Sequence, residues 1–83
     1  MNPINLRIIF IDGTDKTVKA VAADLIAFES RFDLSVARLA SEVRLTHLFF
    51  IAWNVEHRTG ATDLDFEKWT ETVELVTEAE TKK

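Results

Sequence analysis

The stretch RLTHLFFIAWNVEHRTG, residues 44–60, decides the fold that we expect for this chain. At about 100° per residue, a helix would place one set of its apolar side chains on a single broad face. A second set, Phe50, Ile51 and Trp53, lies outside that face, so the helix is apolar most of the way round. A helix of this kind is normally buried on several sides. The residues of the broad face are Leu45, Leu48, Phe49, Ala52 and Val55.

Residue types that favour helix ends set the limits of this helix. Ser35 is a good N-cap candidate. His57 and Arg58 suit the negative C-terminal end of a helix, and Gly60 supplies a stop just beyond it. The sequence therefore predicts one long helix over residues 35–58.

The N-terminal part predicts a β-hairpin over about residues 5–21. Apolar residues alternate with Asn5 and Arg7 at the start of residues 5–11, the pattern then becomes apolar on both faces at Ile9 and Ile11, and β-branched and aromatic types are prominent. Asp12-Gly13 is a turn signal, and a shorter strand follows over residues 17–21. The first strand would be a sticky edge if left open. Two strands alone are marginal in water, so we expect a helix to cover one face.

Apolar spacings of three and four residues predict two more helices. One covers about residues 22–32, with Asp24 as a candidate N-cap or with Ala22 already helical, and the other covers about residues 62–78. The polar end, residues 79–83, is expected to fray. The apolar stripe of the last helix is Phe66, Trp69, Val73 and Val76.

The expected fold is a single α+β domain over residues 1–83. It consists of an N-terminal β-hairpin followed by three α-helices, the middle one long and central. A chain of 83 residues with 47% apolar and 29% charged residues has the composition of a packed globular domain.

Charge and cysteine content exclude several classes of function. The net charge is −4 and the Lys and Arg residues are scattered, which disfavours binding to nucleic acid. Without cysteine there is neither a disulfide framework nor a thiolate metal site. The N-terminus lacks a signal-peptide pattern, and the longest strongly apolar run, residues 48–53, is far shorter than the ~20 residues of a membrane helix. We therefore expect a cytoplasmic protein without membrane contact.

No group of residues predicts catalysis, a metal site or a cofactor. His47 and His57 would lie about 15 Å apart along one helix, too far to share a metal. Asp63 and Asp65 lack the ligand spacing of a calcium loop and are better explained as helix-capping residues. The chain also offers no nucleophile with a base and an orienting group. We expect no enzymatic activity.

The informative feature is a surplus of apolar side chains. Phe49, Phe50, Ile51 and Trp53 fill four of five consecutive positions. Either all four belong to the core, or one side of the helix forms a face for a partner or for self-association, since small domains oligomerise to bury what they cannot bury alone. The acidic side of the 62–78 helix is a second candidate surface, either solvated or attractive to a basic partner. The candidate partner-binding residues are Phe49, Phe50, Trp53, His57 and Trp69.

Two stretches resemble a known family. Residues 44–60 and the segment DFEKWTETVELV, residues 65–76, are similar to small tail assembly chaperones of siphophages, especially those of actinobacteria. In that family a Leu-rich helix with a Phe-Leu-Ala-Trp element ends in a basic residue and glycine, and a Phe-x-x-Trp helix with acidic positions follows. DLIAFESRF, residues 24–32, is similar to the upstream helix of the family. The matching positions are Phe50, Ile51, Ala52, Trp53, Arg58, Gly60, Phe66 and Trp69.

The resemblance implies a non-structural protein made in the cytoplasm of the infected host and absent from the mature virion. Such chaperones keep the long, helical tape measure protein soluble until the tail polymerises, with tail tube subunits as a further candidate client. Many occur with a longer form made by ribosomal frameshifting, and Lys82-Lys83 is compatible with a slippery codon pair. The resemblance transfers no catalytic residue.

Two other classes of protein compete with the chaperone. One is a small oligomeric structural protein, such as a phage connector or capsid accessory component, which would be found in purified virions. The other is an antitoxin-like regulator with a helix-turn-helix core, which would need a basic recognition helix that the sequence lacks.

Overall fold

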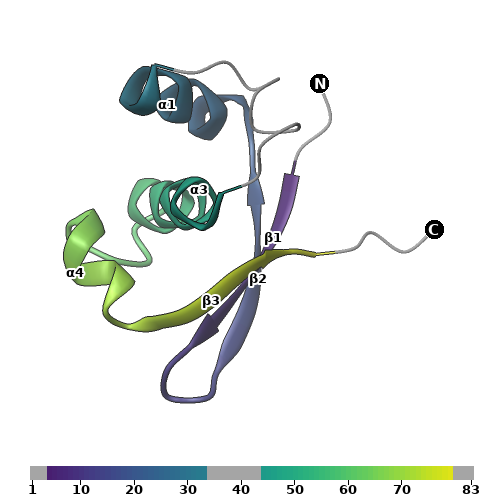
Figure 1. Cartoon of the computed structure of the whole chain (residues 1–83), viewed down its shortest axis with the longest axis vertical. Helices are drawn as coiled ribbons and strands as arrows, with labels where there is room; N and C mark the ends of the chain where they lie inside the picture. The colour runs from purple at the N-terminus through teal and green to yellow at the C-terminus, as the bar shows by residue number, and fades with distance from the viewer. Residues whose placement is uncertain (1–3, 34–43, 80–83) are drawn as a thin grey trace.

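In a computed structural model, which describes residues 4–33 and 44–79, the chain forms a three-stranded antiparallel sheet with the described helices on one side of it (Figure 1). Two strands come first, then three described helices, then the last strand. The bounds are β1 Ile4–Phe10, β2 Asp15–Ala20, α1 Ala22–Phe32, α3 Leu45–Arg58, α4 Phe66–Thr70 and β3 Val73–Glu78.

The hairpin of β1 and β2 lies where the alternating pattern predicts it, with Leu6 opposite Val18. Gly13 in its turn has a φ of 96°, a backbone conformation that glycine adopts without steric cost. Asp12 accepts hydrogen bonds from the backbone N–H of Thr14 at 3.0 Å and from its hydroxyl at 2.7 Å. These bonds fix the turn and lower the pKa of Asp12.

β1 is the central strand, because the sheet order is β2-β1-β3. Leu6 and Ile8 are fully buried beneath the helices, whereas Arg7 points to the other face and is exposed. β3 pairs with the side of β1 that a two-stranded hairpin would leave open. The sticky edge expected on the first strand is therefore closed within the molecule.

Helix α1 has the predicted bounds, with Ala22 already helical. Val21 holds the N-cap position in extended conformation, and Asp24 is the third residue of the helix. The Asp24 carboxylate accepts a hydrogen bond from the Val21 N–H at 2.9 Å, which is the reciprocal half of a capping box. Leu25 and Phe28, 2% and 0% exposed, bury this helix in the core.

Helix α3 ends at Arg58, where the sequence predicts the stop. Gly60 has a φ of 84°, and its N–H donates to the carbonyl of His57 at 3.2 Å. The N–H of Ala61 donates to the carbonyl of Glu56 at 2.8 Å. These two bonds are those of a Schellman motif, which requires a left-handed residue after the helix.

The predicted third helix over residues 62–78 is wrong. After the five-residue helix α4 the chain turns and becomes strand β3. The backbone N–H groups of Glu71 and Thr72 donate to the carbonyls of Lys68 and Trp69, which closes the turn. The order is therefore β-β-α-α-α-β for the described elements, and the expected fold of a hairpin followed only by helices is contradicted.

A β-bulge explains why a helix was predicted there. Leu75 pairs with Ile9, but the next pair joins Val73 to Phe10, so the bulge falls at Glu74. A bulge adds one residue to a strand and shifts its side chains relative to the partner. Val73 and Val76 are therefore both buried although they are three residues apart, a spacing that imitates one face of a helix.

The prediction of one long, central helix over residues 35–58 is also corrected. Its first part falls largely outside the described residues, and Arg44 has an extended backbone (φ −114°, ψ 148°) that interrupts any helix before Leu45. The described helix α3 has 14 residues and lies between α1 and α4 on one side of the sheet (Figure 1). It is one layer on that sheet and not the centre of a helical bundle.

The core lies between the inner face of the sheet and helices α1 and α3. Because α3 meets α1, α4 and the sheet, its apolar side chains are needed on several sides. Phe50 and Ile51, which lie outside the expected core face, are 4% and 0% exposed. Leu45, which was assigned to that face, is instead 56% exposed.

Candidate functional site

An apolar groove runs between α3 and α4. Leu45, Phe49 and Trp53 are spaced by four residues, so they lie along one face of α3. Phe66 of α4 lines two hollows, the first together with Leu45 and Phe49 and the second together with Trp53. We define these two hollows together as the α3–α4 groove.

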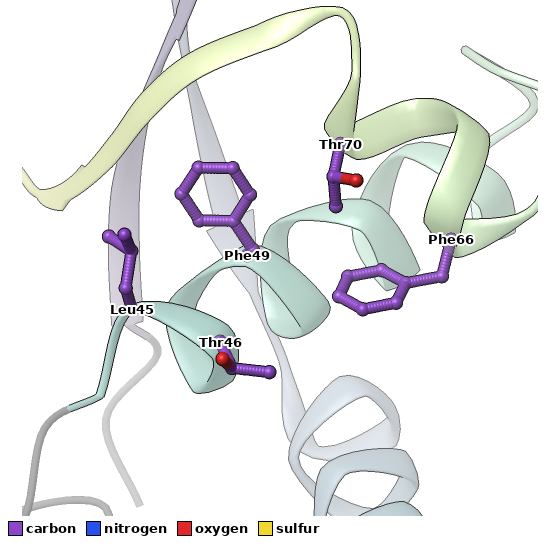
Figure 2. Close-up of a pocket in the computed structure, with 5 residues that line it drawn as sticks. All are labelled: Leu45, Thr46, Phe49, Phe66 and Thr70. Carbon is purple, nitrogen blue, oxygen red and sulfur yellow. The ribbon is translucent and has the colours of Figure 1, made fainter.

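The first hollow has a volume of about 200 Å³, and its lining residues within 4–33 and 44–79 are uncharged. Figure 2 shows the ring of Phe66 extending from α4 toward α3, with Thr46 and Phe49 nearby on α3. Phe49 and Phe66 are half-buried, and Leu45 is mostly exposed. This end of the groove therefore offers apolar surface to water. The lining residues are Leu45, Thr46, Phe49, Phe66 and Thr70.

The second hollow has a volume of about 260 Å³ and a mixed, charged rim. Trp53 and Phe66 form its aromatic wall, with their ring centroids 5.8 Å apart. Asp65 and Glu67 lie on the α4 side, and Arg31 of α1 lies on the opposite side. The groove thus changes character along its length, from apolar at Leu45 to charged at Glu67.

Hydrogen bonds hold the α4 wall of the groove in place. The Asp65 side chain accepts from the backbone N–H of Lys68 at 2.8 Å and caps the helix, as the sequence suggested for this residue. The indole N–H of Trp53 donates to the carbonyl of Leu64 at 2.9 Å, which ties α3 to the segment before α4. Trp69, only 2% exposed, anchors α4 in the core against Phe49. The groove is therefore preformed.

Arg31 shows what kind of group the aromatic wall accepts. Its guanidinium lies 5.5 Å from the ring centroid of Phe50 and 5.7 Å from that of Phe66. These distances fall within the range of cation–π attraction. His57, at the exposed end of α3, stacks on Trp53 with 4.9 Å between ring centroids.

A second polar cluster joins α1 to α3, and we define Asp24, Asn54 and Arg58 as the polar seam. Asp24 is fully buried, and its carboxylate accepts from Arg58 Nε at 2.9 Å and from Arg58 Nη2 at 2.8 Å. Asn54 Nδ2 donates to the same carboxylate at 2.8 Å. Together with the Val21 N–H, these donors surround both carboxylate oxygens. The seam is closed to ligands and serves the packing of the two helices.

The seam keeps Asp24 ionised. Burial raises the pKa of this carboxyl, but the hydrogen bonds from Arg58, Val21 and Asn54 and the positive charge of Arg58 lower it by more. Its pKa therefore lies below the ordinary value of 3.8. The same pairing raises the pKa of Arg58. A buried carboxylate with this many donors is stable only while all of them are present.

Two further polar residues, both on α3, are buried. Glu56, 5% exposed, forms an ion pair with Lys16 of β2 at 2.8 Å. His47, also 5% exposed, packs between Phe28 and Phe32, with ring centroids 5.0 and 4.9 Å away. Its Nδ1 has no hydrogen-bond partner among the described residues. His47 is thus a core residue.

The structure separates the five candidate partner-binding residues into three groups. Phe49 and Trp53 line the groove. Phe50 and Trp69 are buried, at 4% and 2% exposure, and support the groove from beneath. His57 is exposed and covers one side of Trp53 without lining either hollow.

Sequence reasoning missed several residues of the groove. Phe66 was assigned to the core stripe of the 62–78 helix and Leu45 to the core face of the central helix, yet both line the first hollow. Arg31 could not be found from the sequence, because nothing local indicates that α1 would place it over Phe66. The acids around Phe66, at Asp65 and Glu67, were the available signal for the charged end.

Comparison with protein-family models, with curated proteins and with solved structures gives no match. Over residues 4–33 and 44–79, no group of three or more potential metal-ligating side chains is found. In the same part of the chain, none of the helices has the length and apolar character needed to cross a bilayer. The case for a function therefore depends on the sequence motifs and on the geometry of the groove.

Proposed function

We propose that this chain is a bacteriophage tail assembly chaperone that binds the tape measure protein and keeps it soluble during tail morphogenesis. The observation that carries the proposal is the α3–α4 groove, where Phe49, Trp53 and Phe66 are only half-buried. Aromatic side chains on a preformed groove are typical anchors for a protein partner.

The stripe on α3 suits a helical client. Leu45, Phe49 and Trp53 span about 12 Å along the helix axis, which corresponds to roughly two turns of a partner helix. A tape measure segment with an apolar stripe would lay that stripe into the groove. Burial of apolar area gives roughly 25 cal/mol per Å², which association costs reduce, so the complex has the moderate affinity that later release requires.

The order of sequence motifs supports the same function. The Phe50–Trp53 element with Arg58 and Gly60, followed by Phe66 and Trp69, resembles the tail assembly chaperones of siphophages. In this proposal the protein acts in the host cytoplasm and is absent from the mature virion. Tail tube subunits are a further client, and a frameshifted longer form of the chain is a partner. In this proposal the protein acts by binding alone, without enzymatic activity, metal or cofactor.

Co-expression with the tape measure protein tests the proposal. The chain should increase the soluble fraction of the tape measure protein and co-purify with it. Leu45→Ser should weaken both effects, because this residue lines the groove and is 56% exposed. Ile26→Ser is the matched control, since Ile26 is a 63% exposed aliphatic residue on α1 that lines neither hollow. The proposed site would be contradicted if Leu45→Ser kept full solubilisation and co-purification, or if Ile26→Ser weakened them equally.

A small oligomeric structural protein of the phage particle is the second candidate. β2 and β3 are both edge strands of the described sheet, and Ile11 and Leu75 are 66% and 37% exposed. Such edges and side chains favour contacts between copies of the chain. Detection of the chain in purified virions would support this candidate over the chaperone. A homo-oligomer is compatible with both.

A further inference from the structure

We infer that the client of the α3–α4 groove is a basic amphipathic helix, whose apolar residues lie at the Leu45 end and whose Lys or Arg side chains lie at the Glu67 end. This inference rests on the proposed client-binding function and specifies the chemistry of the client. It follows from the different lining of the two hollows.

The apolar end requires uncharged side chains from the client. Among the described residues, those that line the first hollow are uncharged, so a cation placed there would lose water without gaining a partner from them. The 56% exposed side chain of Leu45 and the half-buried ring of Phe49 instead favour aliphatic or aromatic groups.

The charged end favours a cation. Asp65 and Glu67 are exposed on the rim of the second hollow, beside the rings of Trp53 and Phe66. Residues 63–71 contain four acids and one Lys, so this side of the groove is acidic even after Arg31 is counted. Carboxylates next to an aromatic wall attract Lys and Arg by both charge and cation–π contact.

Arg31 supplies an internal example of that contact. Its guanidinium already lies over the rings of Phe50 and Phe66 from the α1 side. A cation from the client would enter the second hollow, where Asp65 and Glu67 line the rim together with Arg31. An acidic client would meet these carboxylates and be repelled, which gives the groove selectivity between clients with similar apolar stripes.

Three synthetic helical peptides test this inference. Each has 14 residues and the same stripe of four Leu, and the flanking positions of one half are Lys, Gln or Glu. Dissociation constants are measured by fluorescence anisotropy at low and at physiological salt. We expect the Lys peptide to bind about five- to tenfold more tightly than the Glu peptide, with the Gln peptide between them and with a smaller range at higher salt.

Matched variants locate the effect. Glu67→Lys should remove or reverse the preference for the Lys peptide, because it inverts the charge at the rim. Glu78→Lys changes the net charge of the chain equally but lies near the far end of β3, away from α4 (Figure 1), and should keep the preference. Leu45→Ser should weaken the binding of all three peptides by the same factor.

Specific results would overturn the inference. These are equal binding of the three peptides, an equal change in Glu67→Lys and Glu78→Lys, or a dimer of the chain alone that sediments as a monomer once Leu45→Ser is introduced. The last result would place a second copy in the groove. The order of the three peptide affinities is measured without the tape measure protein. If the Lys peptide binds best but the tape measure protein does not bind, only the proposed function is rejected. If the tape measure protein binds but the three peptides bind equally, only this inference is rejected.

Discussion

The two ends of α3 contact their neighbours in opposite ways. At the C-terminal end, Asn54 and Arg58 surround the buried Asp24 with directed hydrogen bonds of 2.8–2.9 Å. At the N-terminal end, Phe49 packs against Trp69 of α4 through a ring contact, and the side chains of Leu45 and Phe49 remain partly in water. Directed, buried bonds fix one arrangement of two helices, whereas apolar contacts can be exchanged with those of a partner. The fold should therefore depend on the polar seam, and binding on the groove.

Among single changes in the seam and the groove, Arg58→Ala should cause the largest loss of stability. The variant leaves a fully buried carboxylate without its counterion. Removing one partner of a buried pair is strongly destabilising because it leaves an uncompensated buried charge, and water reaching the site from the partly exposed Arg58 side reduces this loss. Urea denaturation of the parent chain and of Arg58→Ala measures this loss as a difference in the free energy of unfolding, with the m-value expected to stay unchanged.

Arg7→Ala is the control for that comparison. Arg7 also forms a 2.7 Å ion pair, with Asp15, but both side chains are about half exposed. An exposed pair contributes at most about 1 kcal/mol. If Arg7→Ala cost as much as Arg58→Ala, burial would not be the property that distinguishes the seam.

Acid should weaken the seam selectively. Because the pKa of Asp24 in the folded chain is lowered from 3.8, the folded state favours the ionised carboxylate. The stability that it contributes is complete above about pH 4 and is lost as the pH falls through the folded-state pKa. The difference in unfolding free energy between the parent chain and Asp24→Asn should therefore narrow from pH 6 to pH 2. A difference that stays constant over this range would contradict the role of the charge.

A smaller loss of stability is expected at the junction of the two regions. Trp53 is half-buried, lines the groove and donates its indole N–H to Leu64. Trp53→Ala should cost about 1–2 kcal/mol, less than the roughly 3–5 kcal/mol for a fully buried aromatic residue such as Phe50. Thermal unfolding of Trp53→Ala and Phe50→Ala, followed by circular dichroism, gives the ranking. Equal losses would mean that the groove wall is as essential to the fold as the core.

The smallest effect on stability should belong to Leu45→Ser. Because Leu45 is 56% exposed, the change should stay within about 0.5 kcal/mol of the parent chain. Binding of the client should nevertheless fall severalfold. Urea denaturation beside a binding titration separates the two properties, and a variant that loses both together would assign Leu45 to the fold.

The sequence predicted the elements whose signals are local. The hairpin turn at Gly13 and the helix stop at Gly60 each depend on a few adjacent residues, and both lie where they were expected. Strand β3 was missed because the bulge at Glu74 gives Val73 and Val76 a helical spacing. Only the pairing with β1, a contact between distant parts of the chain, distinguishes this strand from a helix.

The groove and the seam also depend on contacts that local sequence patterns do not predict. Phe49 and Trp53 were recognised as candidate anchors from their clustering, but no local pattern separates them from Phe50, which the packing of α1 and α4 buries. The seam joins residues 34 positions apart, Asp24 and Arg58, and neither position signals the other. Burial and pairing at these sites result from tertiary packing and not from local pattern.

The two tryptophans allow the groove to be tested directly by NMR. Trp53 lines the groove and Trp69 is 2% exposed in the core, so their indole N–H signals report on the two regions separately. When a helical segment of the tape measure protein is titrated into the ¹⁵N-labelled chain, the Trp53 indole signal and the amides of α3 and α4 should shift, and those of β2 should stay in place. Shifts confined to β2, β3 or the outer face of the sheet would contradict the groove as the client site.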